Sequence, residues 1–335
     1  MFQDITGRSP SDTAVHVLII GAAGMVGRKL VERLVRDGTL GTEAISLLRL
    51  ADVVPPSTLP RSEAPVQITV ADIAVPGAAA KLLTGRPGVI IDLAAVVSGE
   101  AETDFAKGYR VNLDATRNLL EAIRLAGDGY RPRLVFSSSV AVFGPPLPDV
   151  IGDDQATTPA TSYGTQKAIA ELLLADYTRR GFVDAVGIRL PTICVRPGAP
   201  NLAASGFFSN IIREPLQGRA AVLPVSPDVR HWFASPRSAV GFILHAATMD
   251  TGVLGLQRSL TMPGVSATVA DEIEALRRVA GDAAVALIRA EPDEEIARMV
   301  GGWPRAFDAR RAAQLGFTAE TDFDAIVRAH VEDEL

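Results

Sequence analysis

Tyr163 and Lys167 are the pair of residues whose types and spacing most directly indicate chemistry. With four tyrosines and four lysines in 335 residues, chance predicts a tyrosine followed four residues later by a lysine about 0.05 times. On a helix this spacing places the phenol and the ammonium on one face. A phenol has a pKa near 10, so a tyrosine base working near pH 7 needs about 4 kcal/mol of stabilisation of its anion, and a nearby cation contributes to it. Taken alone, such a pair is more often part of a plain helix surface, but in combination with the strand, serine and glycine motifs described next it predicts a tyrosine general base.

Hydroxyl side chains collect shortly before this pair, in Ser137, Ser138 and Ser139. They follow a short apolar run that reads as a strand. Because open α/β sheets bind ligands at the carboxyl ends of their strands, these hydroxyls are candidate ligand contacts.

A glycine turn near the start of the chain predicts a phosphate site. The buried strand 15–20 leads into Gly21, Gly24 and Gly27, with Met25 and Val26 between the last two. Gly21 permits the tight turn, Gly24 lets the backbone approach a pyrophosphate, and Gly27 lets helix and strand pack closely. The anion would bind the free N–H groups of the helix N-terminus. A purely structural turn is the alternative for such a pattern.

Three later strand ends supply further candidate contacts to a dinucleotide. Asp52 is placed to accept hydrogen bonds from the adenosine ribose, and its charge repels a 2′-phosphate, which favours NAD over NADP. Asp72 and Ile73 follow the next strand, where they line the adenine or form a solvated turn. After a further strand come small residues that let the backbone lie against a cofactor, or that simply end a strand: Leu93, Ala94 and Ala95.

Alternating short β-branched runs and longer helical stretches are the elements that must position these residues. The expected strands are 15–20, 44–51, 66–70, 89–93, 133–137 and 185–190, and the expected helices are 25–37, 77–83, 104–126, 162–180, 207–216, 237–248, 269–280 and 293–300. This pattern predicts an α/β fold with a Rossmann doubly wound parallel sheet. We expect a flexible leader (1–14), an NAD-binding domain (15–190) and a smaller, mainly substrate-binding α/β part (191–335) whose elements partly interleave with the first.

Taken together, the glycine turn, Ser139, Tyr163 and Lys167 resemble the extended short-chain dehydrogenase/reductase family, which contains sugar-nucleotide epimerases and dehydratases. The resemblance covers about residues 15–330. It implies that Ser139, Tyr163 and Lys167 are catalytic, with Asn112 supporting Lys167, and that the protein is a homodimer. Pro191 and Ile193 would lie against the nicotinamide. The sequence departs from the family pattern at Asp92, where the family often has histidine, and at Phe143, where it often has tyrosine.

Four further segments resemble, within that family, dehydrogenases of four-carbon sugar acids: 96–102, 196–201, 205–210 and 303–308. This implies NAD-dependent oxidation of the C2 hydroxyl to a 2-oxo acid. One alternative is a nucleotide-sugar 4-epimerase or dehydratase that retains its NAD. A second is a regulatory protein that binds a dinucleotide without chemistry.

A sugar-acid substrate carries a carboxylate, which needs a cation or several donors because an unpaired buried charge is costly. The candidate cations are Arg196, Arg230 and His231, and the resemblance favours Arg230 because it matches an arginine that contacts the diphosphate in nucleotide-sugar relatives. The remaining candidate substrate contacts are neutral: Ser98, Ser139, Tyr163, Thr165 and Asn201.

Composition excludes several other classes of protein. The net charge of -6 leaves no basic surface typical of nucleic-acid binding. Four histidines without metal-ligand spacing and a single cysteine, Cys194, predict neither a metal site nor a disulfide. We see neither a signal peptide nor a membrane segment, and we expect a cytoplasmic protein.

Overall fold

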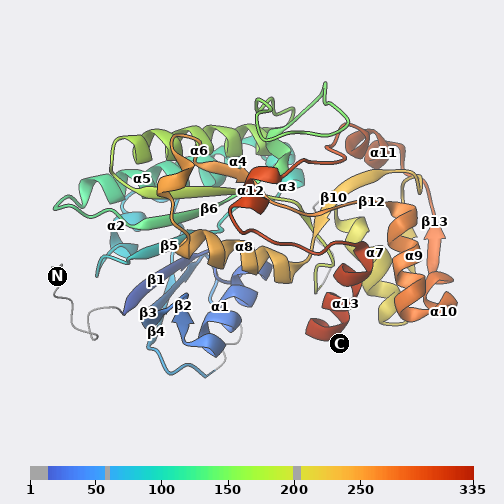
Figure 1. Ribbon diagram of the computed structural model, residues 1–335, viewed down its shortest axis with the longest axis horizontal. Helices are drawn as coiled ribbons and strands as arrows, with labels where there is room; N and C mark the ends of the chain where they lie inside the picture. Colours follow the sequence, from blue (N-terminus) through green and yellow to red (C-terminus); the bar gives the residue numbers. More distant parts are fainter. Residues whose placement is uncertain (1–13, 57–60, 199–204) are drawn as a thin grey trace, which may run out of the picture.

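The structure is a computed structural model that describes residues 14–56, 61–198 and 205–335. Its main sheet follows the order β11, β7, β6, β5, β1, β3, with β4 paired to β3, and all strands run parallel except the short β2, which pairs antiparallel with β3 (Figure 1). The strands are β1 (Val15–Ile20), β2 (Thr39–Leu40), β3 (Glu43–Asp52), β4 (Val66–Val70), β5 (Val89–Asp92), β6 (Arg133–Ser139), β7 (Asp184–Leu190) and β11 (Ser259–Thr261). The order reverses between β1 and β5, the point at which such sheets bind a dinucleotide.

Both faces of this sheet are buried, which explains the continuous apolar runs of its strands. Along β1, Val17 and Ile19 join one buried cluster, whereas Leu18 and Ile20 join another on the opposite face. The first face is covered by α1 (Met25–Asp37) and α8 (Pro236–Thr248), and the second by α2 (Ala78–Leu82), α5 (Ala115–Leu125) and α6 (Ser162–Arg179). The predicted α/β class with a doubly wound parallel sheet is therefore confirmed.

The expected helix 104–126 is not continuous. The helices α3 (Ser98–Thr103) and α4 (Phe105–Tyr109) are followed by a π-helical segment, η2 (Arg110–Asp114), before α5 begins. A π-helical turn places more residues in a turn than an α-helix does, and such turns are frequent at functional sites. Hydrophobic periodicity does not reveal this interruption.

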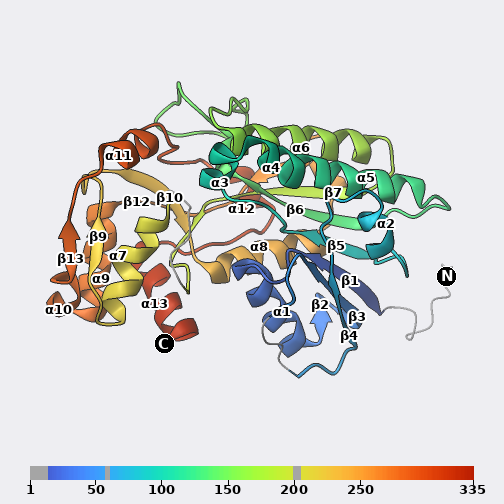
Figure 2. The ribbon, with the colours of Figure 1, turned by 180° about the vertical axis from the view of Figure 1, so that it is seen from behind.

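Most residues after β7 form a smaller group of elements beside the main sheet (Figure 2). Its strands are β8 (Thr192–Ile193), β10 (Arg230–Ala234) and β12 (Val265–Thr268), with β9 (Ala221–Leu223) paired to β13 (Ile288–Ala290). Its helices are α7 (Gly206–Leu216), α9 (Val269–Ala280), α10 (Asp282–Val285), α11 (Glu294–Gly301), α12 (Arg310–Gln314) and α13 (Phe323–Glu334). In contrast, α8 and β11 return to the main sheet, and Ala312 of α12 packs into the same core, so the two parts exchange elements. Within the described ranges, no helix is long and apolar enough to cross a membrane.

Candidate active site

The glycine turn between β1 and α1 leaves room for close backbone packing. Gly21 has a φ of 84°, and a Cβ atom there would lie 2.7 Å from the Ala94 nitrogen. At Gly27 a Cβ atom would lie 2.2 Å from the Gly21 oxygen. Neither position therefore accepts a side chain without a shift of the backbone.

The N-terminus of α1 is open to an anion. Gly24 is its N-cap residue and so provides no side chain to cap the helix, and the first turn, which begins with Met25 and Val26, contains no acidic residue. The first N–H groups of a helix have no partner within the helix, and the helix dipole favours negative charge there. This cradle of glycine and free amides fits the pyrophosphate of a dinucleotide.

Asp52 ends β3 directly beside this turn. Its carboxylate accepts hydrogen bonds from the Ala23 nitrogen at 2.8 Å and from the Val53 nitrogen at 2.7 Å. Because a carboxylate has about four acceptor positions, Asp52 retains capacity for ribose hydroxyls. Arg49, the nearest cation along the strand, instead donates to the carbonyl groups of Leu82 and Thr84.

The remaining cofactor candidates line the neighbouring strand ends. Asp72 is bound by Arg110 at 2.6 Å; burial opposes the lowering of its pKa, but this hydrogen bond holds the pKa below its usual value. The Ile73 side chain is buried in the core, so only its main chain is left to face an adenine. Leu93, Ala94 and Ala95 follow β5, while Pro191 and Ile193 are buried beyond β7.

One face of α6 carries the catalytic candidates. Thr161 caps this helix by accepting from the Gly164 nitrogen at 3.0 Å. A Cβ atom at Gly164 would lie 2.1 Å from the Ala141 oxygen, so this glycine allows α6 to begin against the turn that follows Ser139. Our sequence analysis did not single out Gly164, because its role depends on contact with a segment distant along the chain.

Lys167 is buried on this face, and Tyr163 is half-buried. The Lys167 ammonium donates to the Ser137 carbonyl at 2.7 Å and lies 5.8 Å from the centre of the Tyr163 ring. Burial raises the pKa of Tyr163, while the Ser139 side chain and the positive charge of Arg196 act against that increase. The positive charge of Arg196 thus acts on Tyr163 from outside the helix that carries it.

The buried carboxylate of Asp92 interacts electrostatically with Lys167. Burial lowers the pKa of Lys167 to about 8, and the negative charges of Asp92 and Glu171 oppose this decrease. Asp92 is only 3% exposed, and its burial raises its pKa to about 6 although the charge of Lys167 acts in the opposite direction. Asp92, the departure from the family pattern, therefore lies where it interacts with Lys167.

Asn112 lies in the π-helical segment and is buried. Its side chain accepts from the Val96 nitrogen at 2.9 Å and donates to the Val96 oxygen at 3.2 Å and to Gln166 at 2.7 Å. Asn112 thereby ties the loop after β5 to α6 one residue before Lys167. Its support of Lys167 is thus indirect, through the neighbouring residue.

Two of the candidate substrate residues, Arg196 and Ser98, are associated with the catalytic or cofactor residues, whereas Thr165 and Arg230 are bonded or exposed elsewhere. Arg196 interacts electrostatically with Tyr163, and Ser98 begins α3 after the cofactor strand end. The Thr165 hydroxyl, in contrast, donates to the Thr161 carbonyl of its own helix at 2.9 Å. The Arg230 side chain is 43% exposed. Asn201 lies outside the described residues.

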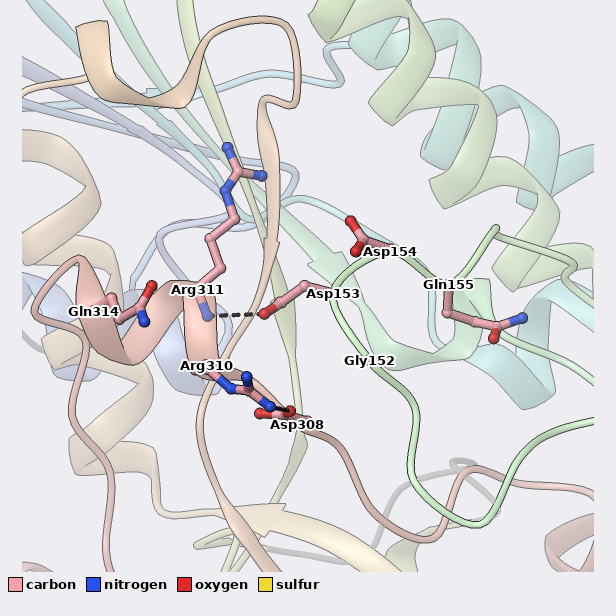
Figure 3. Close-up of a pocket in the computed structure, with 8 residues that line it drawn as sticks. All are labelled: Gly152, Asp153, Asp154, Gln155, Asp308, Arg310, Arg311 and Gln314. Carbon is pink, nitrogen blue, oxygen red and sulfur yellow. Dashed lines mark hydrogen bonds and ion pairs between the residues drawn. The ribbon is translucent and has the colours of Figure 1, made fainter.

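A cavity of about 470 Å³ opens elsewhere, between the loop before α6 and α12 (Figure 3). It is lined by Gly152, Asp153, Asp154, Gln155, Asp308, Arg310, Arg311 and Gln314. Its lining groups form hydrogen bonds with one another; for example, the Asp153 carboxylate accepts from the backbone nitrogen of Arg311 at 2.8 Å. None of its lining residues belongs to the glycine turn or to α6. In the described part of the chain, no group of three potential metal ligands occurs.

Similarity to known proteins covers nearly the whole chain. A sequence model of the NAD dependent epimerase/dehydratase family matches residues 17–248. The chain is 48% identical to D-erythronate dehydrogenase of Cupriavidus necator, over 95% of this chain and 98% of that protein. It is 39% identical to D-erythronate dehydrogenase of Haemophilus influenzae, over 96% of this chain and 100% of that protein.

A solved structure is similar over the same extent. The crystal structure described as the nucleoside-diphosphate-sugar epimerase from Agrobacterium tumefaciens has a TM-score of 0.94 and 59% identity, covering 99% of this chain and 98% of that one. A GalE-like L-threonine dehydrogenase from Cupriavidus necator, at 23% identity and a TM-score of 0.80 over 95% of this chain and 99% of that one, shares the fold. With its nucleotide-binding turn, its parallel sheet and this similarity, the chain belongs to the NAD dependent epimerase/dehydratase family.

Proposed function

We propose that this protein is an NAD-dependent dehydrogenase that oxidises the C2 hydroxyl of D-erythronate to 2-oxo-tetronate. The full-length similarity to two D-erythronate dehydrogenases supports the choice of substrate. The observation that carries the reaction type is the half-buried Tyr163, whose pKa is affected by the Ser139 side chain and whose ring lies 5.8 Å from the Lys167 ammonium on the same helix face. The glycine cradle and Asp52 fit NAD.

Tyr163 is the proton acceptor in this proposal. Its phenolate removes the proton of the C2 hydroxyl while the C2–H bond breaks and the carbonyl double bond forms. NAD, when bound, accepts the hydride that leaves C2. Ser139 donates a hydrogen bond that first orients the hydroxyl oxygen and then the new carbonyl oxygen. Lys167 would hold the nicotinamide ribose and add positive charge near the phenolate.

A nucleotide-sugar 4-epimerase is the second candidate. The name of the Agrobacterium tumefaciens structure favours it, since that chain is 59% identical to this one. Such an enzyme would use the same three side chains, but it would return the hydride to its product and retain its NAD throughout the cycle. A regulatory protein without chemistry is a third possibility, which the complete set of Ser139, Tyr163 and Lys167 argues against.

Incubation of the purified protein with NAD and D-erythronate separates these candidates. A dehydrogenase accumulates NADH in proportion to the substrate consumed. No NADH, together with NAD that stays bound through purification and an epimerised nucleotide sugar, would instead establish the epimerase. A panel of other four-carbon acids defines the substrate more closely.

We also propose that the protein is a cytoplasmic homodimer, joined through the helices that carry Asn112 and Tyr163. Leu125 on α5 and Leu172 on α6 are 70% and 71% exposed, so each of these helices leaves a large apolar side chain uncovered. Light scattering of the purified protein would measure the dimer, and Leu172→Glu should dissociate it.

The proposed cytoplasmic location agrees with the buried, unpaired thiol of Cys194, which is typical of a reducing compartment.

A further inference from the structure

We propose that Arg196 binds the carboxylate of the substrate and so determines the preference of this site for sugar acids. This inference rests on the proposed function, because it names the group that recognises the acid. Arg196 was one of three candidate cations, and its surroundings distinguish it from the other two.

The guanidinium of Arg196 is held in place by neutral groups. Its Nε donates to the Ile193 carbonyl at 3.0 Å, and one Nη donates to the Ser205 hydroxyl at 2.6 Å. The backbone nitrogen of the same residue donates to the Ser209 hydroxyl at 3.0 Å. These contacts fix the side chain between β8 and α7 without neutralising its charge.

Three other arginines with buried or partly buried side chains are paired with an acid, whereas Arg49 and Arg311, which are also partly buried, donate to neutral groups at the protein surface. The ion pairs are Arg189 with Glu171 at 2.7 Å, Arg213 with Glu214 at 2.7 Å, and Arg258 with Asp184 at 2.6 Å. Arg196 has no Asp or Glu oxygen within 4.0 Å among the residues that the structure describes. A partly buried guanidinium without a counter-charge is costly, so a bound anion would stabilise it.

The charge of Arg196 also lies near the reacting position. It acts on the Tyr163 phenol, and it contributes to lowering the pKa of His231. In a 2-hydroxy acid the carboxylate is bonded to the carbon that carries the reacting hydroxyl. A cation that binds this carboxylate must therefore act on the base that accepts the hydroxyl proton, and the charge of Arg196 acts on Tyr163.

The two rival cations are engaged elsewhere. Burial lowers the pKa of His231 to about 4, so its ring is neutral near pH 7. Its Nδ1 donates to the Pro304 carbonyl at 2.8 Å, and its Nε2 is hydrogen-bonded to Thr192 at 2.7 Å. Arg230 is exposed and donates to the Ser266 carbonyl at 3.2 Å. Neither offers a desolvated positive charge to a carboxylate beside Tyr163.

Calorimetric titration of the NADH complex with D-erythronate and with its uncharged amide tests this inference. Wild-type protein should bind the acid more tightly than the amide. In Arg196→Gln, affinity for the acid should fall about 10- to 100-fold, the range of a hydrogen bond to a charged group, while affinity for the amide changes little. Arg230→Gln, the matched control, should keep acid affinity within about twofold.

Two further variants separate recognition from folding. Arg196→Lys keeps the charge and should retain part of the preference for the acid, and Ser205→Ala should weaken acid binding less than Arg196→Gln does. An acid-to-amide ratio in Arg196→Gln equal to that of wild type overturns the inference. If wild type binds neither D-erythronate nor other 2-hydroxy acids such as D-glycerate and L-threonate, the inference also fails. The proposed function fails on a separate result, when D-erythronate binds but yields no NADH.

Discussion

The two sides of the candidate active site consist of different chemical groups, main-chain groups on one side and side chains on the other. The cofactor side consists of main-chain groups around Gly21, Gly24 and Gly27, where room for the backbone matters more than side-chain chemistry. The proposed substrate side depends on individual side chains such as Arg196, which is held between β8 and α7. Tyr163 and Lys167 lie between the two sides. Substitutions on the cofactor side should thus change dinucleotide binding, and those on the substrate side should change recognition of the acid.

Tyr163→Phe should have the largest effect, because it removes the proton acceptor that both sides serve. We expect kcat/KM to fall about 10³-fold, within the range of a positioned general base. The NAD dissociation constant, measured by fluorescence titration, should stay nearly unchanged because the ring remains in place. Turnover near the wild-type rate would show that another group accepts the proton.

Gly27→Ala should damage the cofactor side. The added methyl group would lie 2.2 Å from the Gly21 oxygen, so the turn must shift. Overpacking of this kind costs about 1–3 kcal/mol, which should appear as a lower melting temperature and as weaker NAD binding.

Gly241→Ala is the matched control for this change. Gly241 lies within α8, where an added Cβ atom meets nothing within 4 Å. Alanine there should leave NAD binding unchanged and raise stability by up to about 1 kcal/mol, because it favours the helix over glycine. Equal effects of the two substitutions would argue against a special role for the glycine turn.

Asp52→Asn should alter the choice of dinucleotide. Its carboxylate lies beside the turn, and its negative charge disfavours a 2′-phosphate. We expect wild type to prefer NAD over NADP by at least about tenfold, and the variant to lose most of that preference. Comparison of kcat/KM with the two dinucleotides measures this, and comparable wild-type rates with both would contradict the assignment.

Asp92→Asn should shift a pH profile with a smaller change in the maximal rate. The negative charge of Asp92 opposes the lowering of the Lys167 pKa, so its removal lets that pKa fall further below about 8. Lys167 acts as a cation, and activity that depends on its proton is lost as pH rises through its pKa. The alkaline limb of kcat/KM should move to lower pH by about one unit.

The interpretation depends on the groups that face Lys167, namely Asp92, Glu171 and Tyr163. Asp128→Asn is the control, since that side chain is 90% exposed. A profile that shifts equally in both variants, or a shift to higher pH in Asp92→Asn, would refute the role of Asp92 as the counter-charge of Lys167.

Features that depend on local pattern were predictable from the sequence. The strands Val15–Ile20 and Val66–Val70 and the helices Met25–Asp37 and Val269–Ala280 have the predicted bounds. Their apolar periodicity and flanking turns are local properties. The helices Ser98–Thr103, Arg310–Gln314 and Phe323–Glu334 were not predicted, since they are short or carry weak periodicity.

Features that depend on tertiary contact were not predictable. The π-helical interruption that carries Asn112 follows from contacts to Val96 and Gln166, which are distant in sequence. Resemblance favoured Arg230. Arg196 can be chosen over it only when the ion pairs and hydrogen bonds of both arginines are known, and these depend on tertiary contacts. With so many arginines in the chain, residue type alone could not distinguish them.

Formation of NADH from NAD and D-erythronate by the purified protein tests the central claim most directly. The account predicts steady accumulation of NADH with wild type and its near loss with Tyr163→Phe at unchanged NAD affinity. Absence of NADH formation from D-erythronate and from related four-carbon acids, by protein that binds NAD, would contradict it.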